Sequence, residues 1–179
     1  MDFAVLGDVF EIDGGWDPRV GRKAGTLLGQ EVREWCVRAR AKGLRGVYAP
    51  TVSLRHIIPA NRLNKNYFRR FFYWRGISRA MLYQQRGLDM ESPQETRLDF
   101  RRVPHLFGIP RYMYRTLLVS GWRALTAYLR GQSEAAFNQE LYVWMFIGIV
   151  KQRWADRGKP FEWATSPAPM VATTTVQQS

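Results

Sequence analysis

The chain has 179 residues, enough for one domain with its own core, and its apolar content of 46% argues against wholesale disorder. Lysine and arginine number 27 against 15 acidic residues, a net charge of +12 that favours an anionic partner such as nucleic acid, acidic lipid or a phosphorylated substrate. The single cysteine, Cys36, excludes an intramolecular disulfide and a cluster of thiolate metal ligands.

The N-terminal segment carries acidic side chains and lacks the basic region of a secretory signal peptide, so we expect none. The apolar run at residues 141–150 is about half of the ~20 residues that a membrane-spanning helix needs. We therefore expect that the chain does not cross a membrane.

A first short helix is predicted at residues 3–12, closed by two glycines, and a glycine-rich loop then extends to Gly29. A second helix ending at Gly43 follows, because apolar residues recur at the spacing of one helical face. These residues are Val32, Trp35, Cys36 and Ala39. Glu34 and Arg38 should form an i,i+4 ion pair on another face of the same helix.

Residues 46–49 and 51–56 are predicted to form two short strands separated by a proline. A long helix should begin after Asn64, which is a favourable N-cap, and end at Gly87. The polar, proline-containing residues 87–105 are predicted to form a loop.

Two further helices are predicted at residues 110–130 and 133–153, separated by Gly131, with Ser133 as the N-cap of the second. The tail from residue 164 lacks a periodic apolar pattern and is predicted to be disordered.

Between residues 14 and 80 the predicted order is glycine turn, arginine-rich helix, short strands and basic aromatic helix. This order resembles the C-terminal, acceptor-side half of a family-2 glycosyltransferase, and the resemblance covers about residues 5–155. It implies the α/β fold of the GT-A type, of which this chain would be a mostly helical α+β partial domain with two short strands. On this basis we expect three parts. Residues 1–105 form the C-terminal half of a glycosyltransferase-like domain, residues 106–155 form an amphipathic helix pair suited to a membrane surface, and residues 156–179 form a disordered tail.

By resemblance, the intact enzyme transfers a sugar, with inversion, from a nucleotide-diphosphate sugar to a hydroxyl acceptor, often a lipid-linked or cell-envelope saccharide. A divalent cation, Mn²⁺ or Mg²⁺, is expected with it. The family's donor-binding half with its Asp-x-Asp motif would precede this segment, so we expect the chain to be incomplete as an enzyme and inactive alone. The alternative is a non-catalytic membrane-surface or partner-binding module that retains the acceptor-side scaffold.

The family places a general-base aspartate directly after a glutamate at the start of the arginine-rich helix. Here Glu31 takes the glutamate position, Val32 the aspartate position and Trp35 the family's aromatic position. A base must lie within about 3 Å of the acceptor hydroxyl, and valine cannot accept its proton, so Glu31 is the candidate base. Alternatively, Glu31 only favours the helix dipole and Val32 belongs to the core face.

His56 stands where some family members place a histidine near the metal and the diphosphate, so it is a candidate metal ligand. The other interpretation is a partly buried histidine on a strand face, since the Asp-x-Asp motif is missing from this sequence. Arg75 and Gly76 match the Arg-Gly element that borders the acceptor in the family, which makes them candidate acceptor-side or phosphate-side residues.

Residues 61–88 contain seven cations, seven aromatic residues and no acid, a density typical of a helix at an anionic membrane surface. A core-packing helix with one solvated basic face is the alternative. Residues 110–130 mix apolar side chains with arginine and residues 141–150 are apolar all round, which fits either a helix pair against a membrane or an ordinary core helix. We expect a peripheral location on the cytoplasmic face of a membrane. Nucleic acid is disfavoured as a partner, because no recognition motif is present.

Overall fold

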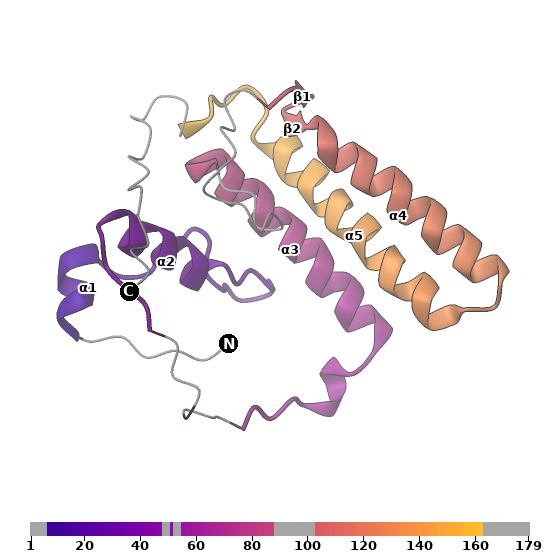
Figure 1. Cartoon of the computed structure of the whole chain (residues 1–179), viewed down its shortest axis with the longest axis horizontal. Helices are drawn as coiled ribbons and strands as arrows, with labels where there is room; N and C mark the ends of the chain where they lie inside the picture. Colours follow the sequence, from indigo (N-terminus) through magenta and orange to yellow (C-terminus); the bar gives the residue numbers. More distant parts are fainter. Residues whose placement is uncertain (1–6, 48–50, 52–54, 88–102, 163–179) are drawn as a thin grey trace, which may run out of the picture.

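The computed structural model describes residues 7–47, 51, 55–87 and 103–162 (Figure 1). This part of the chain is mostly helical, with two short antiparallel strands, which agrees with the predicted α+β character. The elements in chain order are α1 (Gly7–Asp13), α2 (Glu31–Ala41), the 3-10 turn η1 (Ala60–Arg62), α3 (Lys65–Arg86), β1 (His105–Leu106), β2 (Ile109–Pro110), α4 (Arg111–Leu129) and α5 (Ser133–Ala155).

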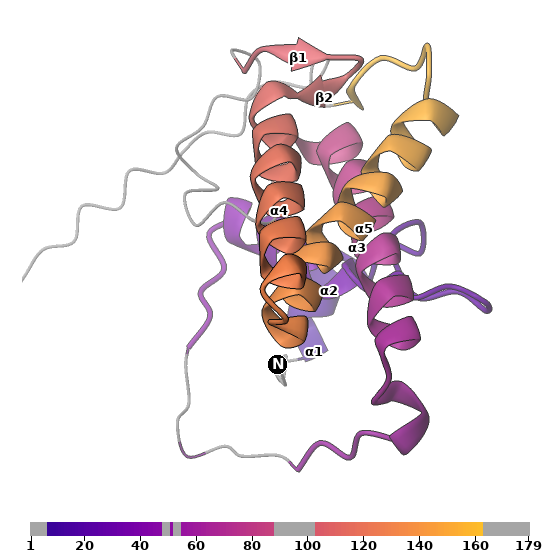
Figure 2. The same ribbon diagram turned by 90° about the vertical axis from the view of Figure 1, so that its right-hand side faces the viewer.

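The three long helices lie side by side, with α5 packed between α3 and α4 (Figures 1 and 2). The helices α1 and α2 lie on the α3 side of this layer, and the β1–β2 hairpin lies at the N-terminal end of α4. The main hydrophobic core forms where α3, α4, α5 and β2 meet. Its buried members are Ala80, Ile109, Met113, Met145 and Ile149.

Local capping signals set both ends of α3 as predicted. Asn64 accepts a hydrogen bond from the backbone N–H of Tyr67 at 2.9 Å, which satisfies one of the unpaired N–H groups in the first turn. At the other end Gly87 has a φ of +65°, and its N–H donates to the Tyr83 carbonyl. Glycine adopts this left-handed conformation without a steric penalty from Cβ, so α3 ends there.

The two N-terminal helices also agree with the sequence. The helix predicted at residues 3–12 is found as α1, although residues 3–6 lie outside the described part of the chain. The helix predicted before Gly43 is found as α2, and Gly43 follows it with a φ of +81°.

The helix pair predicted at residues 110–130 and 133–153 is found as α4 and α5, separated by Gly131 with a φ of +72°. The prediction of Ser133 as the N-cap is wrong, because Gln132 occupies that position and Ser133 is the first residue of α5. Within the described ranges no helix combines the length and the apolar character needed to cross a membrane.

Among the described residues, the two strands lie outside the segments that were predicted to form strands. Within residues 46–49 and 51–56, the described positions 46, 47, 51, 55 and 56 belong to no strand, and the remaining positions lie outside the described part. Strand pairing occurs instead in the hairpin, where His105 pairs with Pro110 and Leu106 pairs with Ile109.

The hairpin turn consists of Phe107 and Gly108, with φ angles of +51° and +72°. Two consecutive positive φ angles are typical of the type I′ turn, whose twist matches that of the paired strands. The sequence did not predict this hairpin, because phenylalanine is not one of the residues that favour such a turn. Most of the predicted loop at 87–105, and the tail from residue 163, lie outside the described residues.

Two glycines allow the backbones of α3 and α5 to approach closely. A Cβ atom added to Gly76 would lie 1.9 Å from the carbonyl oxygen of Met145, and one added to Gly148 would lie 2.0 Å from the carbonyl oxygen of Tyr73. Real Cβ atoms do not come this near to backbone oxygens. Each glycine therefore makes room for the other helix, and α3 continues through Gly76 without interruption.

Candidate functional site

Glu31 is the first residue of α2 and is half-buried beside the loop that leads into this helix. A Cβ atom at Gly21 of that loop would lie 3.8 Å from the Cβ of Glu31. The Oε2 atom of Glu31 is buried and has no hydrogen-bond partner in the described structure. Buried carboxylate oxygens are nearly always paired, and leaving such a group unpaired costs about 1–3 kcal/mol or more. This oxygen is therefore a candidate to meet a ligand.

Val32 is half-buried on α2, and its aliphatic side chain cannot accept or release a proton. The predicted apolar face is confirmed in part: Trp35 and Ala39 are buried, but Cys36 is exposed to solvent. Glu34, predicted on another face of the same helix, is also buried, with a relative exposure of 1%.

Glu34 is buried because two arginines neutralise it. Arg38 donates from Nε to both carboxylate oxygens at 2.9 and 3.0 Å, which confirms the predicted pair. Arg86, at the end of α3, donates from Nε and Nη2 to the Oε1 atom at 3.2 and 2.9 Å. Arg38 also donates to the Gly15 carbonyl at 2.8 Å. The carboxylate thus joins α2, α3 and the loop after α1.

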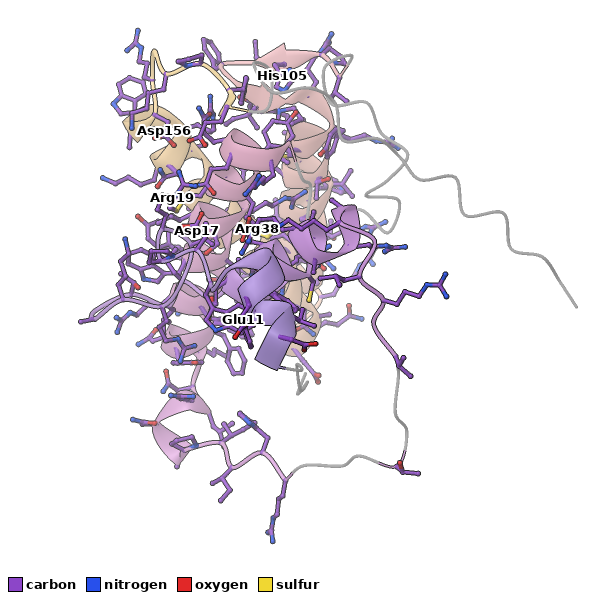
Figure 3. All side chains as sticks on the ribbon, turned by 90° about the vertical axis from the view of Figure 1, so that its left-hand side faces the viewer. Glu11, Asp17, Arg19, Arg38, His105 and Asp156 are labelled. Atoms are coloured by element: carbon purple, nitrogen blue, oxygen red, sulfur yellow. The ribbon has the colours of Figure 1, made fainter. Side chains whose placement is uncertain are left out.

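The loop between α1 and α2 is held by local contacts. Arg19 donates to both carboxylate oxygens of Asp17, which lowers the pKa of that carboxyl below its usual value. Trp35 donates from Nε1 to the Gly14 carbonyl at 3.1 Å and packs against the rings of Phe10 and Trp16. Figure 3 shows the side of the molecule on which Asp17, Arg19 and Arg38 lie. These contacts fix the chain that runs past Glu31.

The other predicted site residues lie outside α2, in coil and on α3. His56 is exposed in coil, and the described residues include no group of three or more histidine, cysteine, aspartate or glutamate side chains able to hold a metal ion. Arg75 lies on α3 with its guanidinium 5.6 Å from the centre of the Phe72 ring. Gly76 faces the backbone of α5. The structure therefore does not assemble Glu31, His56 and Arg75 on one element.

A second polar cluster, which sequence reasoning missed, lies at the C-terminal end of α5. The hydroxyl of Tyr83 is 2.7 Å from Nε2 of His105, and the rings of both residues pack against Phe161. Arg153 donates to the side-chain oxygen of Gln84 and stacks over Phe161 at 4.6 Å. No local pattern could predict this cluster, because Tyr83 and His105 are 22 residues apart.

A small pocket between α3, α4, α5 and the hairpin adjoins this cluster. Its polar lining includes Arg79, Tyr83 and Arg153. The pocket has room for about one water molecule. A sugar acceptor would not fit into this pocket. The polar cluster beside it is suited to holding the C-terminal end of α5 in place.

His105 predicts a pH dependence of stability. Burial, followed by the nearby charge of Arg153, lowers the pKa of His105 below its usual value of 6.5. The unfolded chain therefore binds a proton at this residue more readily than the folded chain, so the free energy of unfolding should fall as the pH drops below about 6.5. The expected result is that His105→Gln reduces the loss of stability between about pH 7 and pH 5.5 in urea titrations.

His56→Gln is the matched control, because His56 is exposed and the chain has only two histidines. A pH profile that changes equally in the two variants would contradict the assignment to His105.

Comparisons with known proteins identify no relative of this chain, so the interpretation of the site depends on its geometry alone. The sequence matches no known protein-family model, and neither curated proteins nor solved structures give a significant match to the chain. The observation that remains for function is the buried carboxylate oxygen of Glu31 at the start of α2.

Proposed function

We propose that this chain is the acceptor-side part of a family-2-type glycosyltransferase of GT-A fold, with Glu31 as the general base. The buried Oε2 atom of Glu31, which lacks a hydrogen-bond partner in the described structure, carries the proposal. An unpaired buried carboxylate oxygen has a simple explanation if a ligand hydroxyl occupies the missing position during the reaction. The arginine-rich helix and the basic aromatic helix, which the sequence places after it in family order, support the same assignment.

In this proposal the carboxylate of Glu31 accepts the proton of an acceptor hydroxyl while the hydroxyl oxygen attacks the anomeric carbon of the donor sugar. The bond from that carbon to the diphosphate oxygen breaks, and the nucleoside diphosphate leaves with the bonding electron pair. General-base assistance of this kind contributes roughly 10²–10⁴-fold to the rate. The acceptor would be a lipid-linked or cell-envelope saccharide.

Among the described residues we find no ligand cluster for the divalent cation that the resemblance implies. These residues include no group of three or more carboxylate, histidine or cysteine side chains, and His56 is exposed without a neighbouring carboxylate cluster. A site for Mn²⁺ or Mg²⁺ would require oxygen ligands from elsewhere. We therefore assign no step of the reaction to a metal held by these residues.

The test is a turnover assay on this chain fused behind a donor-side domain of a family-2 enzyme. We expect release of nucleoside diphosphate from nucleotide sugars with Mn²⁺ and a saccharide acceptor, whereas the chain alone should be inactive. Glu31→Gln in the fusion should lower turnover at least about a hundredfold. It should leave the free energy of unfolding unchanged or raise it, because glutamine has nearly the same size and replaces a carboxylate whose Oε2 atom is buried without a partner in the described structure.

Glu11→Gln is the matched control, since Glu11 is an exposed carboxylate on α1 (Figure 3). Full activity of the Glu31→Gln fusion, or an equal loss in the Glu11→Gln fusion, would exclude Glu31 as the base.

A non-catalytic module that keeps the acceptor-side scaffold is the second candidate, and Val32 favours it. This residue stands at the position of the family's aspartate base, and it is half-buried in α2. If the base was lost, Val32→Asp should raise turnover of the fusion well above that of the unsubstituted fusion. If Glu31 acts as the base, Val32→Asp should bring no gain.

A further inference from the structure

The outward face of α4 carries a stripe of exposed apolar side chains. Met113, Ser120 and Ala127 are buried on the side of α4 that faces the core, seven residues apart. The opposite side stays open, with Leu118, Trp122 and Leu129 retaining 71%, 68% and 74% of their accessible surface. Val119, Leu125 and Tyr128 are exposed as well. Large side chains that recur at this spacing form a continuous apolar strip along one helix face.

Exposed arginines accompany this strip along α4, and acidic side chains are absent from the sequence there. The exposed arginines of α4 and its C-terminal end are Arg111, Arg115, Arg123 and Arg130. Between residues 103 and 133 the sequence contains no aspartate or glutamate. A partner for this face must therefore offer both apolar contact and negative charge.

The position of α4 in the fold leaves its outer face accessible. α5 covers the inner side of α4, and α1 and α2 lie beyond α3 at the other edge of the layer (Figures 1 and 2). The helix has 19 residues, so the strip is about 28 Å long. α4 is thus an edge helix whose outer side carries exposed apolar side chains together with exposed arginines.

We propose that α4 lies flat on an anionic phospholipid surface. The strip around Trp122 enters the boundary between headgroups and acyl chains, where the amphipathic indole ring is favoured. The flanking arginines contact lipid phosphates, which their planar guanidinium groups bind well. The basic aromatic helix α3 is not the contact surface in this arrangement, because residues 76–80 are buried and Arg69 pairs with Glu140 at 2.7 Å.

The charges on α4 favour lipid over a second copy of the chain. Packing two α4 faces together would bring two sets of arginines into proximity without any acid from either strip to pair with them. Like charges in contact oppose association. An anionic lipid surface instead supplies phosphate oxygens along the whole length of the helix.

Vesicle sedimentation with the whole chain tests this proposal. We expect binding to vesicles of phosphatidylcholine mixed with phosphatidylglycerol, weak binding to pure phosphatidylcholine, and release as salt is raised. Trp122→Ala should weaken binding to the anionic vesicles about tenfold, because the indole no longer enters the lipid. Since Trp122 is exposed, thermal unfolding of this variant should match that of the unsubstituted chain.

Trp154→Ala is the matched control for the apolar contact. Trp154 is 70% exposed but lies near the end of α5, where Arg157 stacks on its ring at 5.1 Å. Its removal should leave vesicle binding unchanged. Equal losses of binding for Trp154→Ala and Trp122→Ala would overturn the assignment to α4.

A pair of charge variants tests the arginines. The double substitution of Arg115 and Arg123 to glutamine should weaken binding to anionic vesicles about thirtyfold, since each basic group near the surface contributes about one kcal/mol. The same double substitution of Arg40 and Arg45, both exposed on or after α2, removes equal charge away from the strip and should have little effect. Equal effects would show attraction by net charge alone and overturn the proposal.

Two further outcomes would also overturn it. One is dimerisation in sedimentation velocity that Trp122→Ala abolishes, in the absence of vesicle binding, which would assign the strip to a second copy. The other is the absence of binding to anionic vesicles together with salt-sensitive binding to RNA. The lipid assay does not depend on turnover, so failure of the proposed sugar transfer leaves this inference standing, and the reverse also holds.

Discussion

Gly148→Ala is expected to lower the free energy of unfolding by about 3 kcal/mol, although alanine is intrinsically the better helix former. The added Cβ would lie 2.0 Å from the Tyr73 carbonyl oxygen and 3.1 Å from the Ile77 nitrogen, both of which belong to the backbone of α3. Backbone atoms cannot move aside as a flexible side chain can. The two helices must therefore separate, and the core contacts around Met145 and Ile149 loosen with them.

Urea unfolding monitored by circular dichroism measures this effect, and Gly121→Ala in α4 is the matched control. Gly121 is also a helical glycine, but a Cβ atom there would meet nothing within 4 Å. Its replacement should therefore stabilise the chain by up to about 1 kcal/mol. The two glycine-to-alanine changes should thus have opposite signs. A stabilising Gly148→Ala would contradict the close crossing of α3 and α5.

Gly76→Ala should act in the same way, because its Cβ would lie 1.9 Å from the Met145 carbonyl oxygen. Once one alanine has separated the helices, the second meets less resistance. The double variant should therefore lose less stability than the sum of the two single losses.

The helices could be predicted because their signals are local. Asn64 caps α3 through a backbone group three residues away, and Gly87 and Gly131 end helices by their own conformations. The periodic apolar residues of α4 and α5 likewise lie within single segments. Such signals are complete in a short stretch of sequence, so no knowledge of the fold is required.

The features that were missed depend on contacts between distant segments. The sequence shows that Glu34 can pair with Arg38 one turn later, but the second partner, Arg86, is 52 residues away. Gly76 was interpreted as part of an acceptor-side element, and only the presence of α5 against it shows why a side chain is not tolerated there. The buried oxygen of Glu31 is likewise a property of the folded loop around it.

The sequence also did not determine which face of α4 is buried. Its mixture of apolar and basic residues suggested a membrane-surface helix, but several faces were possible until the packing of α5 fixed which one is buried. The apolar residues of α4 that remain exposed do not contribute to the hydrophobic core, so their presence needs another explanation. This is why the surface proposal rests on α4, although the sequence alone drew attention to the more basic α3.

Glu34→Ala is expected to lower the free energy of unfolding by about 3–5 kcal/mol, the loss typical of breaking a buried ion pair. The side chain of Glu34 is wholly buried, and it accepts hydrogen bonds from the guanidinium groups of both Arg38 and Arg86. Removing it leaves two neighbouring cations without their shared anion at the contact between α2 and α3. Because the side chain of Arg86 is 42% exposed and can turn toward water, the loss should lie at the lower end of that range.

A second paired carboxylate, Glu140, allows a test of whether the loss of stability in Glu34→Ala comes from burial of the charge or from pairing alone. Glu140 also accepts hydrogen bonds from an arginine, Arg69, but both side chains retain about a third of their exposure. Partly exposed ion pairs contribute little because water screens them, so Glu140→Ala should destabilise the chain far less than Glu34→Ala. A double-mutant cycle of Glu34→Ala with Arg86→Ala, followed by urea unfolding, should show a coupling that the Glu140–Arg69 cycle lacks. Similar coupling in both cycles would mean that pairing alone, rather than a buried charge linking α2 to α3, accounts for the contribution of Glu34.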